Sequence, residues 1–269
     1  MTKERPLESW TAGEPYERYV GRWSRKVAEP FVAWLAVDSA SRWGDVGCGT
    51  GALIETILRR QATASVTGVD RSVGYVAHAR TRLKEPRVRL SIGDATALPW
   101  KDAAFDVTVC GLLLNFLPDA GMAIREMIRV TTLGGTVAAY VWDYSRGMEM
   151  MRHFWEAAVA LRAETAWFDQ GERFPLCQPE ALKVLMTQAG LQSVEVGAID
   201  IETRFRNFDD YWRPFLGGQG AAPSYVAALE DHARQQLRET LHQRLPVAAD
   251  GSIPLQARAW AVKGISLGS

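Results

Sequence analysis

The sequence has little cysteine and no excess of charge of either sign. Its three cysteines, Cys48, Cys110 and Cys177, lie far apart and show no C-x-x-C spacing. This pattern predicts neither a disulfide framework nor a zinc site, and we expect no metal. Lysine plus arginine and aspartate plus glutamate number 31 each, so the chain has no basic excess with which to neutralise a phosphate backbone. We therefore expect no nucleic-acid partner.

Long hydrophobic runs are also missing. The longest nearly apolar run, residues 105–117, is interrupted by Asp106 and Asn115 and is too short to span a bilayer. The charged start, Met-Thr-Lys-Glu-Arg-Pro, lacks the apolar core of a secretory signal. We expect a cytoplasmic protein with no membrane partner.

What is present is the composition of a globular protein that can bury a sizeable core. The chain has 269 residues, of which 47% are hydrophobic and 23% charged, close to globular averages. Its ten tryptophans are many for this length. They indicate either ordinary packing between helices or an aromatic-lined pocket, and the sequence leaves both open.

Residues 41–142 alternate between short apolar runs and amphipathic stretches. The run from Phe105 is nearly continuous, as expected of a strand buried on both faces. The predicted strands span 41–46, 65–70, 88–92, 105–114 and 136–141, and the predicted helices span 52–60, 73–84 and the stretch from Pro118 to Leu133-Gly134-Gly135. This order predicts β-α-β units, and hence an α/β fold with a mostly parallel sheet.

The flanking regions add helices and two late strands. The later predicted elements are helices at 147–165 and 179–189, strands at 191–205 and 255–263, and a mainly helical insertion at 208–245 that is broken at 217–220. One domain over residues 1–269 is the most economical account. It would comprise N-terminal helices (14–40), a cofactor-binding core (41–142) and a helical insertion or lid (206–252).

The strongest chemical signal lies between the first predicted strand and the following helix. The sequence there reads Asp45-Val46-Gly47-Cys48-Gly49-Thr50-Gly51, and glycines let the backbone turn tightly and approach a ligand closely. The free amides of the helix N-terminus then face that ligand. The glycine spacing also fits the relaxed dinucleotide fingerprint. Asp45 favours S-adenosylmethionine instead, because a carboxylate repels a pyrophosphate and attracts an ammonium and a sulfonium.

Two further acids follow predicted strands. Asp70 ends the second strand, 19 residues after Gly51 (70 − 51), where an acid can accept from both ribose hydroxyls, although a nicotinamide enzyme places an acid similarly. Asp94 follows the third strand, where a carboxylate can accept from the amino group of adenine. These acids support adenosine binding without distinguishing the cofactors.

The motifs occur in order with Leu98-Pro99-Trp100, Phe105-Asp106-Val107 and Leu133-Gly134-Gly135. Over roughly residues 40–142 the sequence resembles class I S-adenosylmethionine-dependent methyltransferases, specifically the small-molecule branch that includes quinone-biosynthesis C-methyltransferases. The resemblance implies a Rossmann-like, seven-stranded, mostly parallel sheet with helices on both faces and the last strand antiparallel.

The resemblance also implies cofactor-binding roles for particular residues. It assigns the methionine moiety to Asp45, Gly47, Cys48, Gly49 and Gly51, the ribose to Asp70, and the adenine to Asp94 and Ala95, with Arg71 and Leu112 lining the same cleft. In similar enzymes a helix ahead of the sheet folds over the cofactor. Tyr19 and Trp23 are therefore candidates either to cap the cofactor or only to dock this helix by its aromatic face.

Methyl transfer from a sulfonium is an in-line displacement, so the protein must mainly align the reactants and exclude water. No residue stands out as a catalytic base, and the sequence indicates no oligomeric state. Acceptor sites in this family lie on the variable flanks, where the candidates are Asn115, Trp142, Tyr144, His153 and Trp212. The aromatic content favours a small, flat or apolar acceptor. Two alternatives stay open: binding of the cofactor or its demethylated product without turnover, and a nicotinamide-dependent oxidoreductase.

Overall fold

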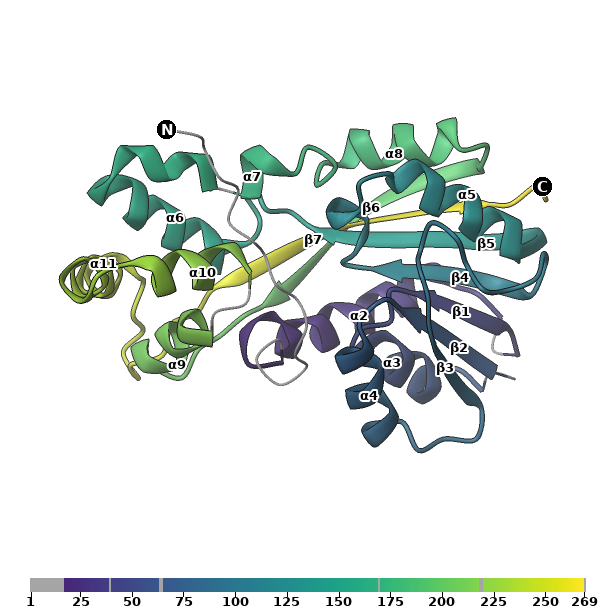
Figure 1. Ribbon diagram of the computed structural model, residues 1–269, viewed down its shortest axis with the longest axis horizontal. Helices are drawn as coiled ribbons and strands as arrows, with labels where there is room; N and C mark the ends of the chain where they lie inside the picture. Colours follow the sequence, from purple (N-terminus) through teal and green to yellow (C-terminus); the bar gives the residue numbers. More distant parts are fainter. Residues whose placement is uncertain (1–16, 39, 63–64, 169, 218–219, 269) are drawn as a thin grey trace.

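The computed structural model describes residues 17–38, 40–62, 65–168, 170–217 and 220–268 (Figure 1). Within these residues seven strands form one sheet in the order β3-β2-β1-β4-β5-β7-β6. The strands are β1 (Arg42–Val46), β2 (Ser65–Asp70), β3 (Val88–Ile92), β4 (Phe105–Gly111), β5 (Thr131–Trp142), β6 (Gln192–Glu202) and β7 (Gln256–Ile265). The first five pair in parallel, and β7 runs antiparallel to both β5 and β6. The predicted sheet with its antiparallel last strand is confirmed.

Helices cover both faces of this sheet. They are η1 (Glu17–Gly21), α2 (Arg22–Leu35), α3 (Ala52–Arg60), α4 (Val73–Arg82), η2 (Leu114–Phe116), α5 (Ala120–Val130), α6 (Glu149–Leu161), η3 (Ala163–Phe168), α7 (Gln170–Arg173), α8 (Pro179–Gln188), α9 (Phe208–Trp212), η4 (Arg213–Gly217), α10 (Ala221–Ala228) and α11 (Asp231–Arg244). Figure 1 shows α2, α3 and α4 on one face and α5 and α8 on the other. Residues 14–16 and 218–219 of the predicted helical segments lie outside the described residues.

The helices α6, η3, α9, η4, α10 and α11 gather beyond the sheet and are called the helical lobe below (Figure 1). The lobe has an aromatic core of its own. The Phe154 and Phe215 rings stack with centroids 4.6 Å apart, and the buried Tyr211 hydroxyl donates to the Met150 carbonyl at 2.9 Å. Many of the aromatic residues thus serve packing. Among the described residues, no helix combines the length and apolar character needed to cross a membrane.

Two predicted boundaries near the centre of the sheet are wrong. Helix α5 ends at Val130, and Leu133-Gly134-Gly135, predicted to terminate that helix, lies inside β5. Gly134 has a φ of +76°, and the pairing of β5 with β4 shifts register here, so the glycines form an irregularity of the strand. Pro118 likewise does not open α5, because Asp119 is the N-cap and the helix begins at Ala120.

The cap of α5 leads to a stability prediction. The Asp119 carboxylate accepts from the Met122 backbone N–H at 2.7 Å, which satisfies one otherwise unpaired donor of the first turn. We expect Asp119→Ala to lower the free energy of unfolding by about 1 kcal/mol, measured by denaturant titration. Asp119→Asn keeps an acceptor and should retain most of the stability. An equal loss in both variants would instead implicate the ion pair of Asp119 with Arg125, which spans 3.9 Å.

Candidate functional site

The glycine loop after β1 is fastened to the neighbouring strand. The backbone N–H groups of Gly47 and Cys48 both donate to the Val69 carbonyl, at 2.8 and 3.0 Å. Gly47 has a φ of +74°, and a Cβ there would collide with the Leu113 side chain. Gly49 also has a positive φ, +51°. A Cβ at this position would meet no atom closer than the Gly47 carbonyl oxygen, at 4.0 Å. The loop thus presents open backbone at Gly49, as close approach of a ligand requires.

Asp45 lies beneath this loop with its carboxylate unsatisfied. Its exposed fraction is 1%, and neither oxygen has a hydrogen-bond partner among the described residues. Burial, together with the negative charge of Asp70, raises the pKa of Asp45 to about 8. A buried carboxylate without donors is costly when ionised. The residue therefore fits a ligand that brings a cation or a donor, such as the ammonium group of S-adenosylmethionine.

Asp70, in contrast, is held by the backbone. Its carboxylate accepts from the N–H of Gly49 at 2.9 Å and from the N–H of Ser72 at 2.8 Å. Burial raises the pKa of Asp70, and these two hydrogen bonds oppose the rise. Each carboxylate oxygen has a second lone pair for another donor, so the orientation of Asp70 suits recognition of ribose hydroxyls. The neighbouring Arg71 is exposed.

The third predicted acid lies at the adjacent strand end. The Gly93 N–H donates to the Asp70 carbonyl at 3.2 Å, so the parallel pairing of β2 and β3 brings Asp94 to the same edge of the sheet. One Asp94 oxygen accepts from the N–H and the hydroxyl of Thr96, at 2.8 and 2.7 Å. These bonds lower the pKa of the Asp94 carboxyl, which is therefore ionised at neutral pH. Ala95 is 9% exposed.

A small cavity of about 40 Å³ adjoins the glycine loop and Asp45. Its other walls come from Ser24 of α2, from the start of α3, from Gly111 and Leu112 at the end of β4, and from Tyr140 of β5. Strand β4 ends at Gly111, earlier than predicted, because Leu112 adopts a φ of +60°. The Leu112 N–H donates to the Tyr140 carbonyl at 2.8 Å. Ser24 and Tyr140 lie in elements that the sequence predicts, but it contains no signal that they face the cofactor.

Tyr19 and Trp23, the two candidate cap residues, do not line this cavity. The Tyr19 hydroxyl donates to the Met151 sulfur at 3.0 Å, and its ring meets Phe215 edge-on. The Trp23 ring packs against Phe205 with centroids 5.4 Å apart. Both aromatics therefore contact residues away from the cavity, while Ser24, next to Trp23 in α2, lines it.

The structure brings together two of the five candidate acceptor residues. Asn115 lies in η2, and its Nδ2 is buried without a partner among the described residues. Its neighbour Phe116 meets Phe174 edge-on at 5.2 Å, and Phe174 contacts Tyr144 at 5.7 Å. We call Asn115, Phe116, Tyr144 and Phe174 the aromatic corner. Phe174 had no signal in the sequence, because it arrives from the connection between α7 and α8.

The other three candidates lie elsewhere. Trp142 is 2% exposed and pairs with Ala259 in the sheet. Trp212 packs against Phe215 in the helical lobe. His153 is half-buried on α6, where burial lowers its pKa and Arg152 lowers it further.

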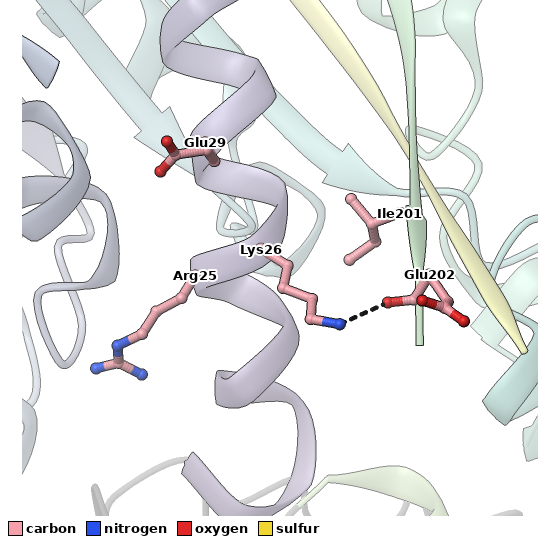
Figure 2. A pocket seen from close by; sticks show the side chains of 5 residues that line it. All are labelled: Arg25, Lys26, Glu29, Ile201 and Glu202. Atoms are coloured by element: carbon pink, nitrogen blue, oxygen red, sulfur yellow. Dashed lines mark hydrogen bonds between the residues drawn. The ribbon is translucent and has the colours of Figure 1, made fainter. Parts of the chain in front are cut away.

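A larger hollow of about 440 Å³ lies between α2 and the edge strand β6 (Figure 2). Figure 2 shows Lys26 reaching across it to the Glu202 carbonyl, a hydrogen bond of 3.1 Å. Arg25 turns the other way and pairs with Glu55 of α3 at 3.1 Å. The hollow contains none of the predicted site residues, so the glycine loop and not the larger volume identifies the candidate site.

Comparisons with known proteins agree with this geometry. A family described as a methyltransferase domain matches residues 44–139. The 2-phytyl-1,4-naphtoquinone methyltransferase of Thermosynechococcus vestitus is 30% identical over 179 residues, 61% of this chain and 78% of that protein. The trans-aconitate 2-methyltransferase of Variovorax paradoxus is 30% identical over 175 residues. That alignment covers 65% of this chain and 62% of the relative, so the chain spans less than two thirds of its length.

Solved structures share the fold at low sequence identity. Phosphoethanolamine N-methyltransferase 2 of Haemonchus contortus, solved with S-adenosyl-L-methionine, superposes with a TM-score of 0.55 at 16% identity. The superposition covers 92% of this chain and 53% of that one. Because the family match begins on the strand that carries Asp45 and the Thermosynechococcus enzyme aligns over most of its length, the chain belongs to the class I S-adenosylmethionine-dependent methyltransferases, with S-adenosylmethionine as its cofactor.

Proposed function

We propose that this chain transfers the methyl group of S-adenosylmethionine to a small-molecule acceptor bound where the sheet meets the helical lobe. The observation that supports this best is the buried Asp45 carboxylate, which has no donor among the described residues. It lies beside the open backbone of Gly49. An ammonium group would satisfy the carboxylate, whereas a pyrophosphate would be repelled by it.

Each part of the site has a proposed task. When bound, the cofactor supplies an electrophilic methyl group and a neutral thioether leaving group. Asp45 and the loop hold the methionine end, Asp70 the ribose hydroxyls, and Asp94 with Ala95 the adenine. Ser24, Leu112 and Tyr140 close over the methionine end and exclude water from the reacting carbon. Tyr19 and Trp23 act on the cofactor site indirectly, because their contacts hold α2 against the rest of the protein. This role is an alternative to direct capping.

For the acceptor we propose the aromatic corner, with the helical lobe as the outer wall of a single-domain enzyme. Its three rings suit a flat or apolar molecule such as a hydroquinone. The buried Asn115 Nδ2 offers a donor for one acceptor oxygen. Catalysis would rest on alignment of that oxygen or an adjacent carbon with the methyl group. We assign no catalytic base.

The function is tested by product analysis with two acceptor classes. Purified protein would be incubated with S-adenosylmethionine and either a reduced naphthoquinone or trans-aconitate, with S-adenosylhomocysteine release and the methylated product followed by mass spectrometry. We expect turnover of the hydroquinone. Turnover of trans-aconitate alone would replace the aromatic acceptor by a carboxylate. Tight binding of S-adenosylhomocysteine with no turnover of any acceptor in a wider panel would support a non-catalytic binding protein, and binding of NADH would support an oxidoreductase.

Asp45 should make cofactor binding depend on pH. The ligand's ammonium requires the ionised carboxylate, and the free protein holds a proton there until the pH approaches about 8. Affinity for S-adenosylhomocysteine, measured by calorimetry, should therefore fall as the pH is lowered from 8 to 6. The fall should approach roughly tenfold for each pH unit well below the pKa.

The matched variant is Asp45→Asn, which removes the titrating group. It should bind at least about tenfold more weakly at pH 8 and should lose the pH dependence. Asp209→Asn, at a carboxylate that pairs with Arg238 on the helical lobe, serves as a control and should behave like the wild type. A wild-type affinity that is the same at pH 6 and pH 8 would contradict the role of Asp45.

Asn115 is tested by two replacements that differ in their polar atoms. If Nδ2 donates to the acceptor, Asn115→Ala and Asn115→Asp should both raise the acceptor KM, by roughly tenfold for one lost hydrogen bond. Affinity for S-adenosylhomocysteine should stay unchanged in both. Retention of a normal KM by Asn115→Asp alone would assign the contact to Oδ1, and normal values in both would remove Asn115 from the acceptor site.

A further inference from the structure

The segment between β3 and β4 carries Asp94 and Ala95 but forms little regular structure. Its own bonds are local: the Ala97 N–H donates to the Asp94 carbonyl at 3.2 Å, and Thr96 donates to the Asp94 carboxylate. Gly93 packs tightly against Val69, because a Cβ there would lie 2.8 Å from a Val69 methyl group. The position of Asp94 therefore depends on what holds the remainder of the segment.

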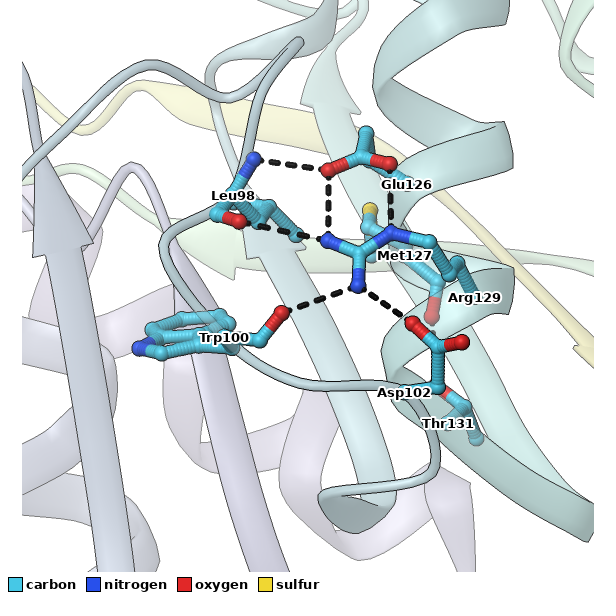
Figure 3. Close-up of polar contacts among 7 residues, drawn as sticks. All are labelled: Leu98, Trp100, Asp102, Glu126, Met127, Arg129 and Thr131. Atoms are coloured by element: carbon cyan, nitrogen blue, oxygen red, sulfur yellow. Dashed lines mark hydrogen bonds and ion pairs between the residues drawn. The ribbon is translucent and has the colours of Figure 1, made fainter.

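Two residues of α5, Glu126 and Arg129, hold that remainder (Figure 3). The Glu126 carboxylate accepts from the Leu98 N–H at 2.7 Å. Arg129 donates to both Glu126 oxygens at 2.7 Å. It also donates to the carbonyls of Leu98 and Trp100, at 3.2 and 2.9 Å, and to the Asp102 carboxylate at 2.7 Å. We call Glu126 and Arg129 the clamp.

These bonds engage all five N–H donors of the guanidinium. The Arg129 and Glu126 side chains are only 27% and 19% exposed, so solvent competes weakly for them. An isolated ion pair on a helix surface contributes little to stability. Most of the clamp's bonds, however, reach the segment outside the helix.

The clamp is connected to Asp94 through a short stretch that is anchored by two buried side chains. The Leu98 N–H donates to Glu126 and its carbonyl accepts from Arg129, so the peptide groups on both sides of Leu98 are fixed. Ala95 and Leu98 are 9% and 6% exposed and belong to the hydrophobic core. Between these two residues, the Ala97 N–H donates a hydrogen bond to the Asp94 carbonyl and closes a turn. A displacement of Leu98 must therefore move the carboxylate of Asp94 or break this turn.

We propose that Glu126 and Arg129 are positioning residues for adenine recognition, acting through the segment that carries Asp94. The proposal rests on the proposed function, in which Asp94 accepts from the adenine amino group. It gives α5, on the far side of the sheet from α3, an indirect effect on cofactor specificity. Lysine cannot replace Arg129, because an ammonium cannot engage Glu126 and two carbonyls in one plane.

The test compares two ligands that differ at the adenine amino group. S-adenosylhomocysteine carries this group, and S-inosylhomocysteine has a carbonyl oxygen in its place. Calorimetry would give both affinities for the wild type and for Arg129→Met, Arg129→Lys and Glu126→Gln. Circular dichroism would establish that each variant is folded. Arg152→Met is the matched control, because it breaks a comparable ion pair, 2.9 Å to Glu156, on α6.

We expect the wild type to prefer S-adenosylhomocysteine by about tenfold or more. Both Arg129 variants should lose most of this preference, mainly through weaker binding of S-adenosylhomocysteine, and Glu126→Gln should lose part of it. Arg152→Met should retain it. If the Arg129 variants do not fold, the ligand preference of Glu126→Gln tests the proposal, and an unchanged preference in that variant would contradict it.

Two outcomes would overturn the proposal in different ways. Folded variants with lower melting temperatures but an unchanged preference would make the clamp purely structural, and the proposed function would stand. A wild type that binds both ligands equally would remove the adenine role of Asp94, and the clamp proposal would fall with it.

Discussion

Two acidic side chains come together where β1 and β2 end, and the protein satisfies only one of them. Backbone N–H groups of Gly49 and Ser72 donate to Asp70, and the first of these bonds also holds the glycine loop in place. Asp45 is almost fully buried and receives no bond from the described residues. Its ionised form is therefore unstable until a cation arrives. The arrangement that destabilises the ionised carboxylate in the free protein is the one on which the proposed recognition of a cationic ligand rests.

The parallel sheet was largely predictable because its strands are short, apolar and separated by amphipathic helices. The predicted bounds of α3, β2 and β3 agree with the structure. The prediction failed where local signals conflict with tertiary pairing. A Leu-Gly-Gly sequence is typical of a helix end, yet α5 ends at Val130, before these residues. The Thr131 hydroxyl there donates to the Met127 carbonyl at 2.6 Å, and the chain passes directly into β5.

The candidate site likewise contains residues that the sequence predicted and residues that it did not. Asp45 and Asp70 lie in the last two residues of β1 and β2, and Asp94 follows β3. Because these parallel strands end at one edge of the sheet, sequence order alone brought the three acids together. No comparable rule predicts the aromatic corner from the sequence, because Phe174 contacts Phe116 and Tyr144 only through tertiary packing. The sequence left open whether Tyr19 and Trp23 cap the cofactor or only dock their helix, and it did not indicate that Ser24 would line the cavity.

Helix α2 connects the cavity beside Asp45 with the helical lobe. The cavity beside Asp45 measures about 40 Å³, and the sheet holds one side of it firmly. The glycine loop is fastened to Val69, and Tyr140 lies in a strand paired on both sides. Helix α2 supplies Ser24 to the opposite side. Because α2 also carries Arg22, which pairs with Asp210 of the helical lobe at 3.1 Å, any movement of this helix that widens the cavity would also strain its contact with that lobe.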